Sequence, residues 1–159
     1  MSKLIYLDVC ALCRPFDDQS FLRIRMETEA VNLILSKVKE NFYQMVVSPV
    51  HMKEMEAIQD EIERIQLITL LNKYGNSVKV NLKKTRQRAE ELVALGFGVA
   101  DAAHVAFAEM AQAEFISCDK RLVKKCVRHK IKVWSGNPYG KNRTRRNHQI
   151  YKHPKKKEN

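Results

Sequence analysis

Two spacings of apolar residues alternate along the chain. Short apolar runs rich in β-favouring residues, typical of buried strands, occupy residues 3–9, 43–47, 78–80, 115–118 and 131–134. Helical spacing of apolar positions predicts helices over residues 20–42, 48–54, 59–74, 83–95, 99–113 and 120–129. Ser48 and Pro49 suit the start of a helix, and Gly75 is suited to a left-handed helix end. Strands and helices therefore alternate throughout.

This alternation predicts an α/β fold. Because parallel strands need crossover connections, and helices then cover both faces of the sheet, we expect a three-layer α/β/α sandwich with a mostly parallel central sheet. The chain has 159 residues, 45% of them hydrophobic, which suits one domain of ordinary size. We place this domain at residues 1–137. Residues 138–159 are basic, with few apolar side chains, and are predicted to form a flexible tail.

The charge favours a polyanionic partner. Lysine and arginine number 29 against 18 acidic residues, which gives a formal net charge of +11. Nucleic acid is the first candidate and an anionic membrane surface the second. No stretch approaches the roughly 20 apolar residues that span a bilayer, and the first residues do not resemble a signal peptide, so we expect a cytoplasmic protein. Four cysteines give no dense disulfide framework, and reduced thiols are expected.

Three aspartates lie in apolar surroundings, where a charge is costly. Asp8 follows a strand-like run, Asp101 lies in an alanine-rich helix, and Asp119 closes another strand-like run. The adjoining sequence offers no basic partner to Asp8 or Asp101, although Lys120 follows Asp119. One interpretation is that each aspartate caps a turn or the start of a helix.

A second interpretation is that these carboxylates hold a divalent metal ion. Mg²⁺ and Mn²⁺ prefer oxygen ligands, and a cation offsets the repulsion between clustered carboxylates. In an open parallel sheet the carboxyl ends of the strands border one crevice, which is where Asp8 and Asp119 are expected.

Four segments of the chain resemble the PIN-domain nucleases, in particular the VapC-like toxin ribonucleases of toxin–antitoxin modules. They are IYLDVCAL, SPVHMKEM, GVADAAHVAFAEMAQAEFISCD and the basic helix that follows, and the resemblance covers most of residues 3–134. The resemblance implies a site of four acids that binds one or two Mg²⁺ or Mn²⁺ ions, carried onto Asp8, Glu54, Asp101 and Asp119. At the second position Glu56 lies only two residues away, but on a helix it points in another direction.

The resemblance also implies an activity and partners. The expected activity is metal-dependent endonucleolytic cleavage of RNA that leaves a 5′ phosphate, with metal ions activating water and stabilising the departing oxygen. A cognate antitoxin protein and a homodimer are implied as well. This chain departs from the pattern after Asp8, because many relatives have asparagine or a small hydroxyl residue there and this chain has Val9 and Cys10.

Supporting residues are expected around the acids. Ser117 matches a small hydroxyl position of the family and is a candidate to orient a carboxylate or metal-bound water, or is a plain strand serine. His104 shares a helix face with Asp101, as a site residue or as a hydrogen-bonded core histidine. The basic helix is a candidate RNA contact, together with the tail, or else a solvated face; its residues are Lys120, Arg121, Lys124, Lys125 and Arg128.

Other functions remain as alternatives. A PIN-like RNA-binding protein without catalysis is the first, because the positive charge alone would support binding. A Cys10-x-x-Cys13 oxidoreductase is the second and requires a thiol of lowered pKa. A zinc site that adds Cys118 and Cys126 to that pair lacks a second short CxxC spacing. The charged segment 14–18 is expected to form a structural ion-pair network.

Overall fold

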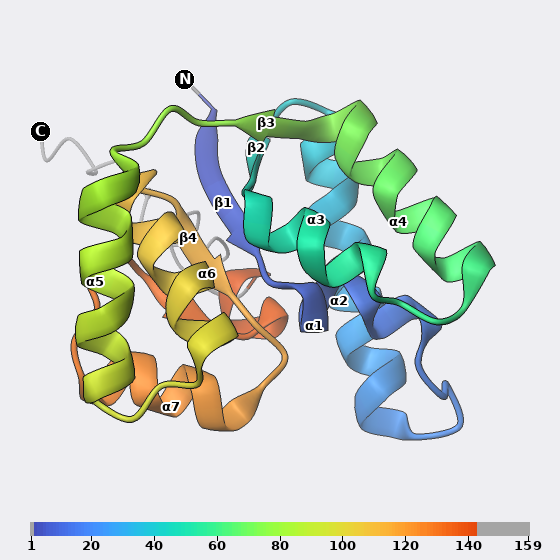
Figure 1. Ribbon diagram of the computed structural model, residues 1–159. Coiled ribbons are helices and arrows are strands. Elements are labelled where there is room, and N and C mark those ends of the chain that lie inside the picture. Colours follow the sequence, from blue (N-terminus) through green and yellow to red (C-terminus); the bar gives the residue numbers. More distant parts are fainter. Residues whose placement is uncertain (1, 143–159) are drawn as a thin grey trace, which may run out of the picture.

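The computed structural model describes residues 2–142, whose centre is a sheet of five parallel strands (Figure 1). The strand order is β3-β2-β1-β4-β5, with β1 in the middle. The strands are β1 (Lys3–Leu7), β2 (Tyr43–Val47), β3 (Gly75–Ser77), β4 (Glu114–Ile116) and β5 (Ser135–Gly136). The expected basic tail lies outside the described residues from position 143 onward.

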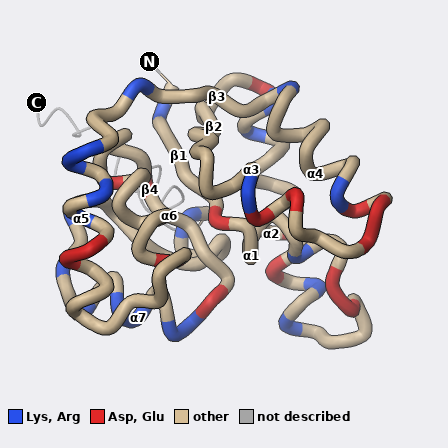
Figure 2. The backbone as a smooth tube through the Cα atoms, viewed as in Figure 1, with Lys and Arg blue, Asp and Glu red and all other residues tan. Residues whose placement is uncertain are grey.

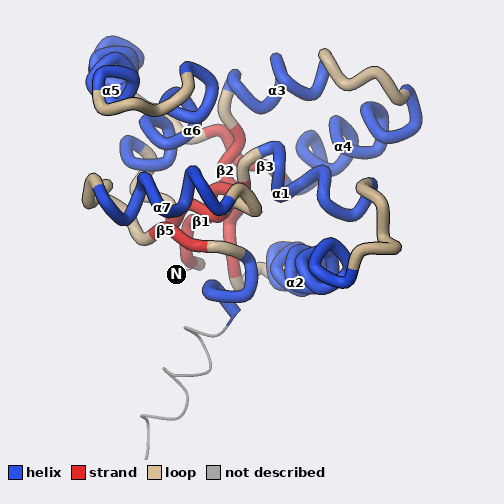
Figure 3. Tube along the Cα trace, turned by 90° about the horizontal axis from the view of Figure 1, so that it is seen from below, coloured by secondary structure: helices blue, strands red, loops and turns tan. Residues whose placement is uncertain are grey.

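Helices connect the strands and enclose the sheet from both sides (Figure 3). They are α1 (Val9–Cys13), the short 3-10 helix η1 (Arg14–Phe16), α2 (Leu22–Lys39), α3 (Pro49–Glu56), α4 (Glu61–Tyr74), α5 (Leu82–Ala94), α6 (Val99–Met110) and α7 (Lys120–Arg128). A last helical turn spans residues 138–142. None of the helices within residues 2–142 is long and apolar enough to cross a membrane.

Two apolar clusters, one on each face of the sheet, form the core. Ile5 and Leu7 point to one face, where they pack with buried side chains from α1, α2, α3 and α4. Tyr6, between them on the strand, points to the other face, toward side chains from α5, α6 and α7. Alternate residues of a strand face opposite sides, so a strand buried on both faces is apolar throughout, as β1 is. The three-layer α/β/α sandwich expected from the sequence is confirmed.

Two edge strands differ from their sequence prediction. β3 begins at Gly75, immediately after α4, instead of at residue 78, and Gly75 is extended (φ −77°) instead of left-handed. Met45 of β2 pairs with Gly75, and a Cβ on this glycine would lie 2.2 Å from Val47 Cγ2 and 2.4 Å from the Leu71 carbonyl oxygen. The glycine is therefore required by close approach of the backbone and not by a turn.

The last strand also lies at a different place in the sequence than predicted. Residues 131–134 are not a strand; β5 is Ser135–Gly136, which pairs with Phe115 and Ile116 of β4. Ile131 and Val133 instead pack against the cluster beneath α6. The apolar side chains of this run are partly buried, and pairing with β4 begins only at Ser135.

Candidate functional site

Asp8 lies at the carboxyl end of the central strand. Its backbone N–H continues the pairing of β1 with β4 by donating to the Ile116 carbonyl at 3.1 Å, which brings Asp8 beside Ser117. Asp8 is also the N-cap of α1, because its Oδ1 accepts from the Ala11 N–H at 2.9 Å. The strand therefore passes directly into a helix at this residue, and Asp8 is only 4% exposed.

Burial dominates the ionisation of Asp8. Loss of water raises the pKa of this carboxyl from 3.8 to about 6, against hydrogen bonds from Ser117 and the Ala11 N–H that lower it. Asp101 raises the pKa further through its negative charge. Asp8 is thus a desolvated carboxylate at neutral pH, in a place where a positive charge would be stabilised.

Asp101 and Asp119 lie near this carboxyl, on α6 and at the start of α7. Asp101 is half-buried in the first turn of α6, and no side-chain or backbone donor within residues 2–142 binds its carboxylate. Burial and then the charge of Asp119 raise the pKa of Asp101, and Glu54 adds to this effect. Asp119 caps α7 by accepting from the N–H groups of Arg121 at 2.9 Å and Leu122 at 3.2 Å.

Glu54 is held in place by a buried histidine. It lies in the last turn of α3, and its Oε1 accepts from His104 Nε2 of α6 at 2.8 Å. On its other side, His104 Nδ1 lies 2.5 Å from the Tyr6 hydroxyl of β1. The His104 hydrogen bond holds the pKa of Glu54 below its ordinary value. His104 is therefore both a hydrogen-bonded core histidine and a contact of a site carboxylate.

The polar network beneath the site extends to a second histidine. His51 donates from Nε2 to the Leu7 carbonyl at 2.6 Å, and its Nδ1 accepts from the Ser48 N–H at 3.1 Å. These partners fix the neutral ring, and burial lowers the pKa of His51 to about 4. Ser48 Oγ lies 2.7 Å from the Tyr6 hydroxyl and joins both histidines into one network.

Sequence reasoning missed Tyr6, Ser48 and His51 as parts of the site. Tyr6 lies in an apolar run and its hydroxyl is buried. A polar atom at such a position needs a partner, and this requirement was the available signal. The partner itself, His104, lies 98 residues away in sequence and could be identified only in the folded structure.

Removing the Tyr6 hydroxyl tests the network. We expect Tyr6→Phe to lower the free energy of unfolding by about 1–3 kcal/mol, because His104 Nδ1 and Ser48 Oγ both lose a buried partner. Urea unfolding measures the loss as a lower midpoint at unchanged slope. Tyr74→Phe is the matched control, since within residues 2–142 the Tyr74 hydroxyl makes no hydrogen bond. Equal midpoints for the two variants would contradict the role of the network.

The structure confirms the capping interpretation for two of the three aspartates. Asp8 and Asp119 are helix caps, whereas Asp101 is not, because Gly98 is the N-cap of α6. As placed, no three acidic, histidine or cysteine side chains within residues 2–142 are close enough to hold a metal ion. The donor chemistry nevertheless fits a hard divalent cation, because the charge of Asp101 raises the pKa of Asp8, and the charges of Asp119 and Glu54 raise the pKa of Asp101.

The basic residues of α7 lie beside the acids. Figure 2 shows lysine and arginine along α5 and α7 and acidic residues where α3 leads into α4. Lys120, Arg121, Lys124 and Arg128 are exposed, whereas Lys125 is half-buried and donates to the Gly96 carbonyl at 2.8 Å. Leu122 and Cys126 bury the opposite side of the helix. Four of the five basic side chains thus face solvent on the helix that Asp119 caps.

The cysteines do not have the properties of a redox pair. Burial raises the pKa of the Cys10 and Cys13 thiols to about 12 each, with nearby carboxylates adding to the effect. A CxxC oxidoreductase needs the opposite, a stabilised thiolate. The neighbouring segment has the expected structural role, because Arg14 pairs with Asp17 at 2.9 Å and with the buried Glu27 at 3.4 Å.

Comparison with known proteins reveals similarity in structure. No family model matches the sequence, and no curated protein matches it. The fold is similar to a chain in the crystal structure of FitAcB from Neisseria gonorrhoeae, with a TM-score of 0.53 and 13% sequence identity. The match covers 85% of this chain and 98% of the other. At this identity the match establishes the architecture of the chain.

Proposed function

Since this chain has the PIN-domain fold, with five parallel strands in the order 3-2-1-4-5, we propose that it is a metal-dependent endoribonuclease. The observation that carries the proposal is the group of carboxylates at the carboxyl ends of β1 and β4. Asp8, Asp101 and Glu54 come from three different elements, and their charges act on one another. We assign Mg²⁺ or Mn²⁺ to the site, held by Asp8, Glu54, Asp101 and Asp119.

The metal, when bound, would neutralise the scissile phosphate, activate water and stabilise the departing oxygen. The protein's own residues have supporting tasks. Ser117 donates to Asp8 and accepts from the Asp119 N–H at 3.0 Å, so it ties two of the proposed ligands to one strand end. His104 orients the Glu54 carboxylate, and Tyr6 holds the ring of His104 in turn.

The proposal extends to partners. RNA is the substrate class, since the exposed basic residues of α7 lie beside the acids and the net charge is +11. A role as the toxin of a toxin–antitoxin module, a cognate antitoxin, a homodimer and a cytoplasmic location are proposed from the family motifs and the shared fold.

A second candidate function rests on a specific observation. Asp8 and Asp119 use a carboxylate oxygen to cap α1 and α7, and the acids are not arranged as a three-ligand metal centre within residues 2–142. A PIN-like protein that binds RNA without cleaving it would have the same caps and the same basic helix.

Cleavage of RNA by the purified protein tests the first proposal. We expect cleavage of fluorescently labelled single-stranded and hairpin RNA with Mg²⁺ or Mn²⁺, and none with a chelator. Asp101→Asn should reduce the rate of cleavage by about 100-fold or more. The substitution removes a negative charge that would stabilise the bound metal ion and the transition state. Asp60→Asn is the matched control: Asp60 is the exposed N-cap of α4, and asparagine caps helices equally well.

The outcomes separate the two candidates. Undiminished cleavage by Asp101→Asn would overturn the proposed site. A wild-type protein that binds these RNAs tightly but does not cleave them with either metal would favour the non-catalytic function.

A further inference from the structure

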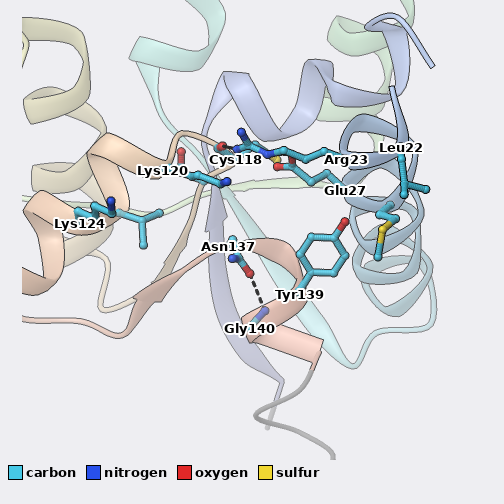
Figure 4. A pocket seen from close by; sticks show the side chains of 12 residues that line it. Leu22, Arg23, Glu27, Cys118, Lys120, Lys124, Asn137, Tyr139 and Gly140 are labelled. Carbon is cyan, nitrogen blue, oxygen red and sulfur yellow. Dashed lines mark hydrogen bonds and ion pairs between the residues drawn. The ribbon is translucent and has the colours of Figure 1, made fainter. Parts of the chain in front are cut away.

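A groove opens on the side of β4 that faces α2. Its volume is about 720 Å³, within the range of sites for small molecules. One wall is α2, another is the end of β4 with the start of α7, and the third is the segment at 137–140 (Figure 4). The groove is distinct from the cluster of carboxylates, which faces α3 and α6.

An apolar and aromatic surface lines part of the groove. Leu22 and Met26 of α2 are 62% and 47% exposed, and both line it. The ring of Tyr139 stands across from Leu22 (Figure 4). Asn137 Oδ1 accepts from the Gly140 N–H at 2.7 Å, while its side-chain amide N–H groups have no acceptor within residues 2–142. A flat ring with polar edges matches such a surface, because it can stack on the tyrosine and accept from Asn137.

The charges around the groove are mainly positive. Arg23, Lys120 and Lys124 line it against a single carboxylate, that of Glu27. Glu27 is already paired, with Arg23 at 2.8 Å and Arg14 at 3.4 Å. Lys120 and Lys124 are exposed and form no ion pair within residues 2–142. These two ammonium groups are therefore available to an anion.

The groove is connected to the carboxylates through one residue. Ser117 lines the groove, and its hydroxyl contacts both Asp8 and the Asp119 N–H. The side chain of Ser117, at the end of β4, thus lies between the groove and the carboxylates. If a nucleic-acid strand binds at the carboxylates, the next nucleotide of that strand would reach the groove.

We propose that this groove binds one unpaired nucleotide of the RNA substrate, with the base against Tyr139 and the phosphate at Lys120 and Lys124. The proposal rests on the proposed ribonuclease function and specifies its substrate as single-stranded beside the scissile bond. The chain's own residues 143–159 suit the groove less well, since they are rich in lysine and arginine and carry the same sign of charge.

Binding of RNA without divalent metal tests the groove independently of cleavage. We use the full chain with a chelator and a labelled 10-nucleotide single-stranded RNA. A series of RNAs of the same sequence, each lacking the base at one position, is measured beside it. For the wild type, one abasic position should weaken binding by about 5- to 100-fold, because one stacked base is lost.

Two substitutions of Tyr139 separate stacking from folding. Tyr139→Leu should lower affinity for the intact RNA by a similar factor. This variant should bind the intact RNA and the abasic RNA that weakens wild-type binding with equal affinity. Tyr139→Phe keeps the ring and should bind nearly as the wild type does. Circular dichroism and thermal unfolding verify that both variants are folded. A leucine variant that still discriminates the abasic copy would overturn the proposal.

The phosphate contact has its own measurement. Lys124→Ala should reduce the slope of log affinity against log salt concentration by about 0.7, the value for one contact to a single strand. Lys84→Ala, an exposed lysine at the start of α5, is the matched control and should leave the slope unchanged. Equal slopes for Lys124→Ala and the wild type would contradict the assignment.

The two proposals fail in different ways. Cleavage that depends on Asp101 together with binding that ignores Tyr139 would overturn the groove and leave the ribonuclease standing. Base-dependent binding through Tyr139 without cleavage would support the groove and overturn the ribonuclease. Equal effects of Tyr139→Leu on a duplex of the same sequence would also overturn the groove, because paired bases are not free to stack there.

Discussion

Asp8→Asn is expected to make the protein more stable at neutral pH while it abolishes cleavage. Asparagine is nearly the same size as aspartate, and its side-chain oxygen can still accept from the Ala11 N–H and cap α1. The substitution removes a buried negative charge that forms no ion pair within residues 2–142. Stability and activity therefore change in opposite directions at this residue.

The sign follows from the pKa of Asp8. Folding raises this pKa from 3.8 to about 6, so between these values the folded protein binds more protons than the unfolded chain. The stability of the wild type therefore falls as the pH rises through this window. Above pH 6 the charged carboxyl costs up to about 3 kcal/mol, which asparagine does not incur. Below pH 3.8 the difference should vanish.

Urea unfolding at several pH values measures this difference. The gap between Asp8→Asn and the wild type should be greatest at pH 7 and close to zero near pH 4. Mg²⁺ or Mn²⁺ should narrow the gap at pH 7, because a bound cation stabilises only the charged wild type. A variant less stable than the wild type at pH 7 without metal would show that the Asp8 charge is compensated in the folded protein.

The greatest loss of stability outside the site is expected from Glu109→Leu. The Glu109 side chain is 1% exposed, and its two oxygens accept from Arg88 Nε at 3.0 and 3.3 Å. Glu109 also accepts from the Lys132 N–H at 3.3 Å. With leucine at this position, the half-buried guanidinium of Arg88 loses its main partner. The free energy of unfolding should therefore fall by about 3–5 kcal/mol. This ion pair joins α5 to α6, the helix that carries Asp101.

Two further variants test whether the broken charge pair causes the loss of stability in Glu109→Leu. Arg88→Met combined with Glu109→Leu should recover most of the stability, because an apolar pair replaces a buried charge pair. Arg86→Ala is the control: it breaks the exposed Arg86–Glu90 pair and should change stability by less than about 1 kcal/mol. Thermal unfolding compares all three. A loss in the double variant as great as in Glu109→Leu would assign the effect to packing.

The site was predictable in part. Asp8, Asp101 and Asp119 are predictable because each is a charge in apolar sequence, and each lies at or near the start of a helix. The assignment of all four acids as metal ligands stays a prediction. Glu54 has no such local signal; the structure connects it to Asp101 through the charge that raises the pKa of Asp101.

The sequence by itself determined the fold class, the longer helices and the three central strands, but not the two edge strands or the short helix α1. β2 spans the predicted residues 43–47, and α3 starts with Ser48 and Pro49 as expected, because side-chain periodicity and helix caps are local properties. Tertiary structure alone decided where β3 and β5 pair and which groups surround the carboxylates. Tyr6, His104 and Glu54 meet from three separate elements. Contacts between residues so distant in sequence leave no periodic pattern, since they depend on how the helices pack on the sheet.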